Sequence, residues 1–271
     1  MSGFKKVATL VVALSLFVSV CSMFGWTKTQ AHETGYAHLD KDIVVVQKGK
    51  SAKITLYTAE GKAVKTSKVT WQSDNKKVAI VKKGKITGKK VGTTYVVASY
   101  KDIVCECKVL VVAKKSLKTV ELNGVKVKID KNIDLGKGEK LTGSVGYKTI
   151  YDSNNAVFAV DVVDEIEELA VPGAADYILD ELVGSVITGL ESRAKGHMLA
   201  DTDYKDTINE RTVGILGLRD TGSTTGLKLY YYIVGKRVVI ATIMFDYNKV
   251  GEKDLAKYNE ELEKFVVLTE E

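Results

Sequence analysis

Four sequence blocks decide the fold of the N-terminal half of this 271-residue chain. They are Val69-Thr70-Trp71-Gln72-Ser73-Asp74-Asn75, Val78-Ala79-Ile80-Val81, Gly84-Lys85-Ile86-Thr87-Gly88 and Gly92-Thr93-Thr94-Tyr95-Val96-Val97-Ala98. Runs of β-branched and aromatic residues between glycine turns predict short strands. Val69, Trp71, Val78 and Ile80 alternate with polar residues. We therefore expect one buried face, with Trp71 as the anchor of the core.

Outward from these blocks, similar runs extend over residues 39–114, and no helical periodicity interrupts them. The runs expected to form strands are 43–47, 51–57, 68–73, 78–81, 85–88, 93–100 and 103–112. Seven short strands with glycine turns predict a sandwich of two sheets.

In order and spacing, the four blocks and the closing Cys107-Lys108-Val109-Leu110-Val111 resemble the bacterial immunoglobulin-like (Ig-like) domain, group 2. The resemblance covers residues 39–114. It implies a bacterial surface or secreted protein, as in intimin- and invasin-like adhesins, with a spacer or adhesion module outside the cell. It implies no enzyme, and the family has no catalytic residues to transfer to this chain.

The N-terminus has the layout of a secretory signal peptide. Phe4-Lys5-Lys6 is a positive start, residues 7–20 are uncharged and mostly apolar, and Thr29-Gln30-Ala31 has small residues at the two cleavage positions. We expect a signal peptide at 1–31 and a linker at 32–38. After cleavage no transmembrane segment is expected.

Two alternatives remain for the N-terminus. Residues 7–26 are long enough to span a bilayer as an uncleaved anchor. Cys21 is a candidate for lipidation, although the preceding Val18-Ser19-Val20 has a bulky valine where lipoprotein signals prefer a small residue. All three interpretations place the rest of the chain outside the cytoplasm.

From residue 115 the pattern changes to a mixture of strands and helices. Asn123-Gly124 predicts a type I′ hairpin turn. Further strands are expected at 144–151, 156–163, 212–218, 227–234 and 238–246. We expect a helix that starts near Pro172, is capped at Gly196 and buries a face formed by Leu179, Leu182, Val183, Val186, Ile187 and Leu190. A last helix is expected at 252–266, with Leu255, Tyr258 and Leu262 on one face.

This order predicts an α+β domain at 115–271, an antiparallel sheet covered by two helices. The order of the elements is similar to the PsbP and Mog1-like fold. The expected fold class is therefore two domains, an all-β Ig-like sandwich followed by an α+β domain. Fold alone does not determine function.

The sequence lacks the motifs of common enzymes. No His-Glu-x-x-His pair, Gly-x-Ser-x-Gly elbow or phosphate-binding glycine loop is present. The stretch Gly222-Ser223-Thr224-Thr225-Gly226 is interpreted as a polar loop, and His197 as a structural residue after a helix end. Cys105 and Cys107 lie two apart on one expected strand, so we expect two small apolar side chains facing the core. We predict no catalytic residue, no metal site and no cofactor.

The C-terminal half contains two clusters of acidic residues. Asp201, Asp203, Asp206 and Glu210 resemble a loose calcium loop, but the spacing and the glycine of an EF-hand are missing. Asp161, Asp164, Glu165, Glu167 and Glu168 precede the long helix. Their expected role is a favourable interaction with the helix dipole.

The net charge of +6 hides an asymmetry between the two halves. Residues 39–114 carry 17 lysines against 6 acidic residues, and residues 115–271 carry 20 basic against 27 acidic residues. Seven lysines cluster at Lys76, Lys77, Lys82, Lys83, Lys85, Lys89 and Lys90. They form either a solvated rim that protects an edge strand or a surface for an anionic polymer such as teichoic acid. Export and the absence of interleaved aromatic residues disfavour nucleic acid.

The sequence thus predicts a secreted or cell-surface bacterial protein without catalytic activity. The Ig-like domain is expected to act as a spacer or adhesion module, and the C-terminal domain to bind a ligand. Expected partners are an anionic cell-wall polymer or another surface protein. The alternatives are an extracellular enzyme with its site in 115–271, and a lipoprotein subunit of an envelope complex.

Overall fold

A computed structural model describes residues 36–141, 143–170, 173–192 and 194–270. The expected signal peptide, its cleavage site, Cys21 and Pro172 lie outside these residues. The described residues divide into two compact units, 36–118 with 207–211, and 119–206 with 212–270. The sequence-based boundaries of signal peptide, linker and domains stay predictions.

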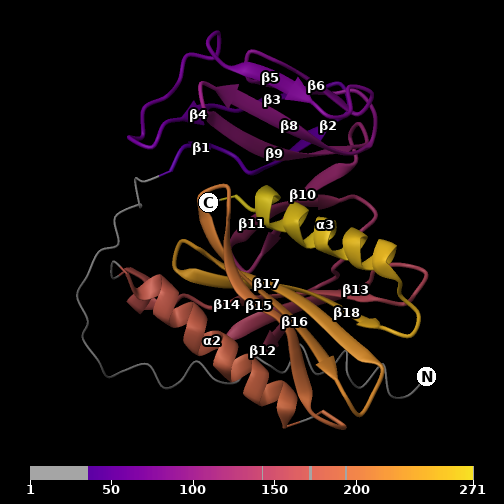
Figure 1. The fold of residues 1–271 in the computed structure, drawn as a ribbon. Coiled ribbons are helices and arrows are strands. Elements are labelled where there is room, and N and C mark those ends of the chain that lie inside the picture. Colours follow the sequence, from indigo (N-terminus) through magenta and orange to yellow (C-terminus); the bar gives the residue numbers. More distant parts are fainter. Residues whose placement is uncertain (1–35, 142, 171–172, 193, 271) are drawn as a thin grey trace. The chain divides into compact units, whose positions relative to one another are not determined.

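The N-terminal unit is a β-sandwich (Figure 1). One sheet has the order β2-β9-β8-β5 and the other β3-β7-β6, and β1 pairs with β4. Their bounds are β1 His38–Leu39, β2 Ile43–Gln47, β3 Ser51–Lys53, β4 Leu56–Tyr57, β5 Thr70–Ser73, β6 Ala79–Lys82, β7 Lys85–Gly88, β8 Gly92–Tyr100 and β9 Ile103–Val112. The core contains alternate residues of both sheets, as expected for a sandwich; among them Ile86, Val96 and Val109 are fully buried.

The alternation expected around Trp71 is corrected in two places. Trp71 is only partly buried at the margin of the core, where its indole N–H donates to the carbonyl of Thr66. Ile80 points outward and is 37% exposed, whereas Ala79 is fully buried. The cause is the turn at Asn75, whose carbonyl accepts from the N–H groups of Val78 and Ala79. The strand therefore starts at Ala79, and the pattern shifts by one residue.

The C-terminal unit is built on a seven-stranded sheet of order β12-β13-β14-β18-β17-β16-β15. The strands are β12 Glu139–Leu141, β13 Ser144–Ile150, β14 Val157–Val163, β15 Met198–Ile208, β16 Arg211–Asp220, β17 Thr225–Val234 and β18 Arg237–Asp246. The registers from β12 to β18, from β18 to β17 and from β17 to β16 are antiparallel, as predicted. A hairpin of β10 Leu117–Leu122 and β11 Val125–Asp130 turns at Asn123-Gly124, both with positive φ.

Two helices lie on the two faces of this sheet (Figure 1). Helix α2, Ala174–Glu191, packs its apolar side on one face, where it meets Ala159, Leu229 and Ile240. Helix α3, Glu252–Leu268, packs on the other, where Phe265 meets Phe158 with ring centroids 5.5 Å apart. No helix among the described residues is long and apolar enough to cross a membrane.

Three expectations for the C-terminal half are corrected. Strands β12 and β15 were not predicted, because their residues are mostly polar and exposed, as edge strands allow. Helix α2 ends at Glu191, so Gly196 does not cap it. Leu255 was expected on the buried face of α3, but it is 37% exposed.

Candidate functional site

All seven lysines of the predicted surface are exposed. None of their ammonium groups forms an ion pair or hydrogen bond with another described residue. The structure separates them into two groups at opposite ends of β7. Lys82, Lys83 and Lys85 form the β6–β7 hairpin end, where Lys82 lies directly opposite Lys85.

The other four lysines surround the start of β6. Lys76 and Lys77 lie in the turn before it, and the backbone N–H groups of Lys89 and Lys90 both donate to the carbonyl of Val78. The sequence cluster is therefore two surface groups separated by the length of β7. The sequence could not separate them, because the spacing along the chain does not show which ends of the strands meet.

The two cysteines face the core as expected. Cys107 is fully buried and Cys105 is partly buried against the same core, and both thiols are free. Burial, with Asp42 and Asp40 adding a smaller effect, raises the pKa of Cys107 to about 12. A thiol with so high a pKa is a poor nucleophile. The pair therefore has a packing role.

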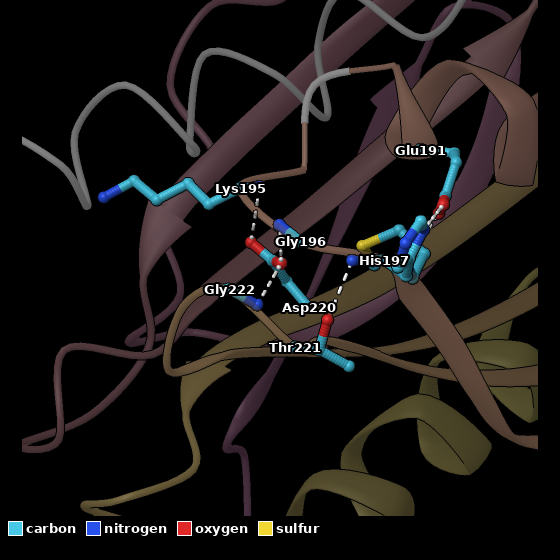
Figure 2. A network of polar contacts seen from close by, with 8 residues as sticks. Glu191, Lys195, Gly196, His197, Asp220, Thr221 and Gly222 are labelled. Carbon is cyan, nitrogen blue, oxygen red and sulfur yellow. Dashed lines mark hydrogen bonds and ion pairs between the residues drawn. The ribbon is translucent and has the colours of Figure 1, made fainter.

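The most elaborate polar network joins the segment after α2 to the β16–β17 turn (Figure 2). The carboxylate of Asp220 accepts four hydrogen bonds. Three come from the backbone N–H groups of Lys195 (3.1 Å), Gly196 (3.0 Å) and Gly222 (2.9 Å), and one from the Ser223 hydroxyl (2.7 Å). We call this arrangement the Asp220 clasp. Burial raises the pKa of Asp220, but these hydrogen bonds outweigh burial and leave it below its usual value.

The clasp brings two backbone segments unusually close together. A Cβ on Gly196 would lie 2.3 Å from the backbone nitrogen of Gly222, and one on Gly222 would lie 2.3 Å from the nitrogen of Gly196. Both positions therefore require glycine. Gly196, expected as a helix cap, is used for this contact instead. The polar loop predicted at 222–226 is confirmed in its first part, since β17 begins at Thr225.

His197 lies beside the clasp and is paired with a carboxylate. Its Nδ1 is 2.8 Å from Glu191 Oε1, its backbone N–H donates to Thr221 Oγ1 at 2.8 Å, and its side chain is 84% exposed. Hydrogen bonds from the Met198 N–H and from His197 hold the pKa of Glu191 below its usual value. Because Asp220 and Glu191 both accept hydrogen bonds from backbone N–H groups of the segment after α2, this network positions the backbone of that segment.

The acidic cluster at 201–210 is not a loop. Asp201, Asp203 and Asp206 lie on β15, and Glu210 lies in the turn that follows. Asp201 and Asp203 lie on one side of the strand and Asp206 lies on the other, so the four carboxylates do not converge as in a calcium loop. Among the described residues, no group of three or more His, Cys, Asp or Glu side chains could hold a metal ion.

The cluster before α2 also differs from the prediction. Asp161 is in the middle of β14 and only 4% exposed. It therefore does not lie at the start of a helix and does not interact with a helix dipole as predicted. Asp164, Glu165 and Glu167 interact with Arg237 and Lys236. The single sequence signal for Asp161 was an acid within an apolar run, Val157 to Val163.

The ion-paired group around Lys264, which is largely buried, was not predicted from the sequence. Lys264 of α3 pairs with Asp130 at 2.6 Å and with Glu261 at 2.5 Å, and Tyr151 donates to Glu261 at 3.0 Å. Only the i,i+3 spacing of Glu261 and Lys264 is visible in the sequence, since Asp130 and Tyr151 are over 100 residues away.

Comparison with known proteins identifies the N-terminal unit. Residues 37–109 match the family model of the bacterial Ig-like domain (group 2). The resemblance found in the sequence is therefore confirmed for this part of the chain. No curated protein matches the chain.

Solved structures are similar to parts of this chain at low identity. The cyanobacterial PsbP protein CyanoP of Synechocystis sp. PCC 6803 is 9% identical, with a TM-score of 0.40, over 59% of this chain and 94% of its own. PA94 from Pseudomonas aeruginosa, a protein of unknown function described as a putative regulator, is 13% identical, with a TM-score of 0.32, over 54% of this chain and 94% of its own. Domains 4–9 of the surface layer protein SbsC are 19% identical, with a TM-score of 0.26, over 78% of this chain and 30% of theirs.

Proposed function

We propose that this chain is an exported bacterial surface protein without catalytic activity. Its Ig-like domain contacts an anionic polymer of the cell wall, and its C-terminal unit carries a further binding function. The match of residues 37–109 to a bacterial Ig-like family supports a surface role. The observation that carries the polymer contact is the set of seven exposed lysines, none of which pairs with an acidic side chain in the part of the chain that the structure describes.

Charge favours the N-terminal unit as the contact. Residues 39–114 have a net charge of +11, whereas residues 115–271 have a net charge of −7. A polyanion is attracted by the first and repelled by the second. We therefore expect the polymer to bind residues 39–114 and to avoid the C-terminal unit.

Sedimentation with purified cell walls tests this function. The exported protein is mixed with walls at low salt, and the fraction that pellets is measured as NaCl is increased to about 1 M, where the Debye length is ~3 Å. We expect strong retention at low salt and release at high salt. Walls stripped of their phosphate polymers are the control and should retain little. Retention that ignores salt, or no retention, contradicts the proposal.

The mode of attachment needs a separate measurement. Mass spectrometry of the N-terminus of the exported protein distinguishes cleavage after Ala31 from lipidation of Cys21 and from an uncleaved anchor. We expect a free His32 at the N-terminus, because Thr29-Gln30-Ala31 supplies the small residues that cleavage requires.

A further inference from the structure

The outer face of the β3-β7-β6 sheet carries lysines in register on all three strands. Lys53 of β3 lies directly opposite Lys85 of β7, and Lys85 lies directly opposite Lys82 of β6. Directly opposed residues share one face of a sheet. All three side chains are exposed, so they form a line of positive charge across the strands. We call Lys53, Lys85 and Lys82 the lysine row.

The lysine row is unfavourable for the fold by itself. Like charges directly opposite each other on neighbouring strands are destabilising. No acidic side chain among the described residues pairs with the row. The hairpin beside it adds Lys83 with φ 50°, a left-handed conformation that asparagine or glycine adopts more readily. Unfavourable local features that persist together point to a functional constraint.

Protection of sheet edges does not explain the row. Lysines on edge strands hinder pairing with other chains, and this accounts for Lys53 and Lys82, since β3 and β6 are the edges. Lys85, however, is on the central strand β7, which is paired on both sides. Its charge protects no edge.

Lysine is the only cation that the row can offer to an anion, since all 17 basic residues between 39 and 114 are lysines. Arginine binds planar carboxylate or phosphate groups by two parallel hydrogen bonds, whereas lysine acts as a point charge that binds phosphate from any direction. Lysines therefore fit a flexible polymer whose single negative charges reach the protein in varied orientations. Strands in a sheet are ~4.8 Å apart, so the row presents one flexible ammonium per strand along a line.

We propose that the lysine row binds a linear phosphodiester polymer that runs across β3, β7 and β6, with successive phosphates meeting successive strands. This inference rests on the proposed function and adds a specific surface, a direction and a requirement for several linked phosphates. The neighbouring row on the same face, Ser51, Thr87 and Ile80, is uncharged, and its two hydroxyls bond each other at 2.8 Å. It offers contact for the uncharged links of the polymer.

The test uses the exported protein and glycerol-phosphate oligomers of increasing length, with glycerol phosphate as the monomer. The row variant is Lys53→Gln with Lys82→Gln and Lys85→Gln. The matched control is Lys62→Gln with Lys65→Gln and Lys68→Gln, which removes the same charge from exposed lysines of the same unit that belong neither to the row nor to the seven predicted lysines. We expect affinity to rise with oligomer length and the monomer not to bind. The row variant should bind the long oligomer at least 10-fold more weakly, and the control less than 3-fold more weakly.

Each outcome decides a specific claim. Equal losses in both variants, or a larger loss in the control, overturn the row as the binding surface. Wild-type protein that binds walls but no oligomer overturns the phosphodiester assignment and leaves the wall contact standing. Wild-type protein that binds neither fails the proposed function itself. The row variant should unfold at a temperature no lower than the wild type, because substitution removes repulsion between lysines; a large drop would overturn the claim that the row is unfavourable for the fold.

Discussion

The two faces of the seven-stranded sheet differ in whether their buried ionisable side chains have partners. On α3, the Lys264 side chain is 12% exposed and its ammonium pairs with the carboxylates of Asp130 and Glu261. Under α2, Asp161 is 4% exposed and its Oδ1 has no hydrogen-bond partner among the described residues, nor do the hydroxyls of Ser144 and Thr242 on the same face. One face buries its charges as a paired group, and the other buries a lone carboxyl.

This difference shows what each face requires. On the α3 side, attraction to Glu261 and Asp130 outweighs burial and raises the pKa of Lys264. On the α2 side, burial raises the pKa of Asp161 to about 7, and attraction to Lys148 opposes this rise. The stability contributed by the α3 group depends on the presence of all its partners, whereas the effect of Asp161 on stability depends on pH.

Removal of Lys264 has the largest expected effect. Lys264→Met leaves the buried Glu261 without its cation, which should lower the free energy of unfolding by about 3–5 kcal/mol. The urea midpoint, followed by circular dichroism, measures the loss. The double variant Lys264→Met with Glu261→Met is the control and should recover most of it, since no charge is left unpaired. If the double variant is as unstable as the single one, the packing of the Lys264 side chain, and not its charge, stabilises the fold at this face.

The pH dependence of stability tests Asp161. Its pKa is raised in the folded state, so folding favours the protonated form, and this group's penalty is absent below pH 4. The penalty grows between about pH 4 and 7 and then stays constant, on the order of 4 kcal/mol. Because asparagine cannot ionise, Asp161→Asn should remove this decrease in the free energy of unfolding with rising pH.

Urea unfolding at pH 5 and pH 8 compares the two proteins. The wild type should lose more stability at pH 8 than Asp161→Asn does. Equal losses in both would show that the carboxyl is not buried alone, and the contrast between the two faces would disappear.

The smallest effects are expected at the Asp220 clasp, which follows the C-terminus of α2. Asp220→Ala leaves three backbone N–H groups without their acceptor and should cost about 1–3 kcal/mol. His197→Ala, on the exposed side of the same network, should leave the unfolding midpoint unchanged. Amide hydrogen exchange at Lys195, Gly196 and Gly222 should speed up only in Asp220→Ala. Faster exchange in His197→Ala would mean that the histidine, too, holds the clasp.

Elements with a strong local signal were predicted well. The Asn123-Gly124 turn and the strands expected at 144–151, 156–163, 227–234 and 238–246 match the structure, because turn residues and apolar runs act over a few residues. Strands β12 and β15 were missed, because an exposed edge strand needs no apolar pattern. Its hydrogen bonds come from a partner strand that the local sequence does not show.

The same limit applies to the candidate sites. The lysines were visible as a cluster, but Lys53 was not among them, since it joins Lys85 and Lys82 only through strand pairing. Asp161 was assigned to a helix start from its place in the sequence, whereas the sheet puts it under α2. Asp220 carried no more signal than an ordinary turn acid.

The sequence by itself determined the Ig-like character of the N-terminal half, the basic and acidic halves, and most strands and both helices. Tertiary structure alone decided which lysines stand in one row, that one buried carboxyl is left alone, and that Gly196 meets Gly222. The reason is physical. Turn preference and periodicity depend on near neighbours, whereas register, burial and pKa depend on residues brought together from distant parts of the chain.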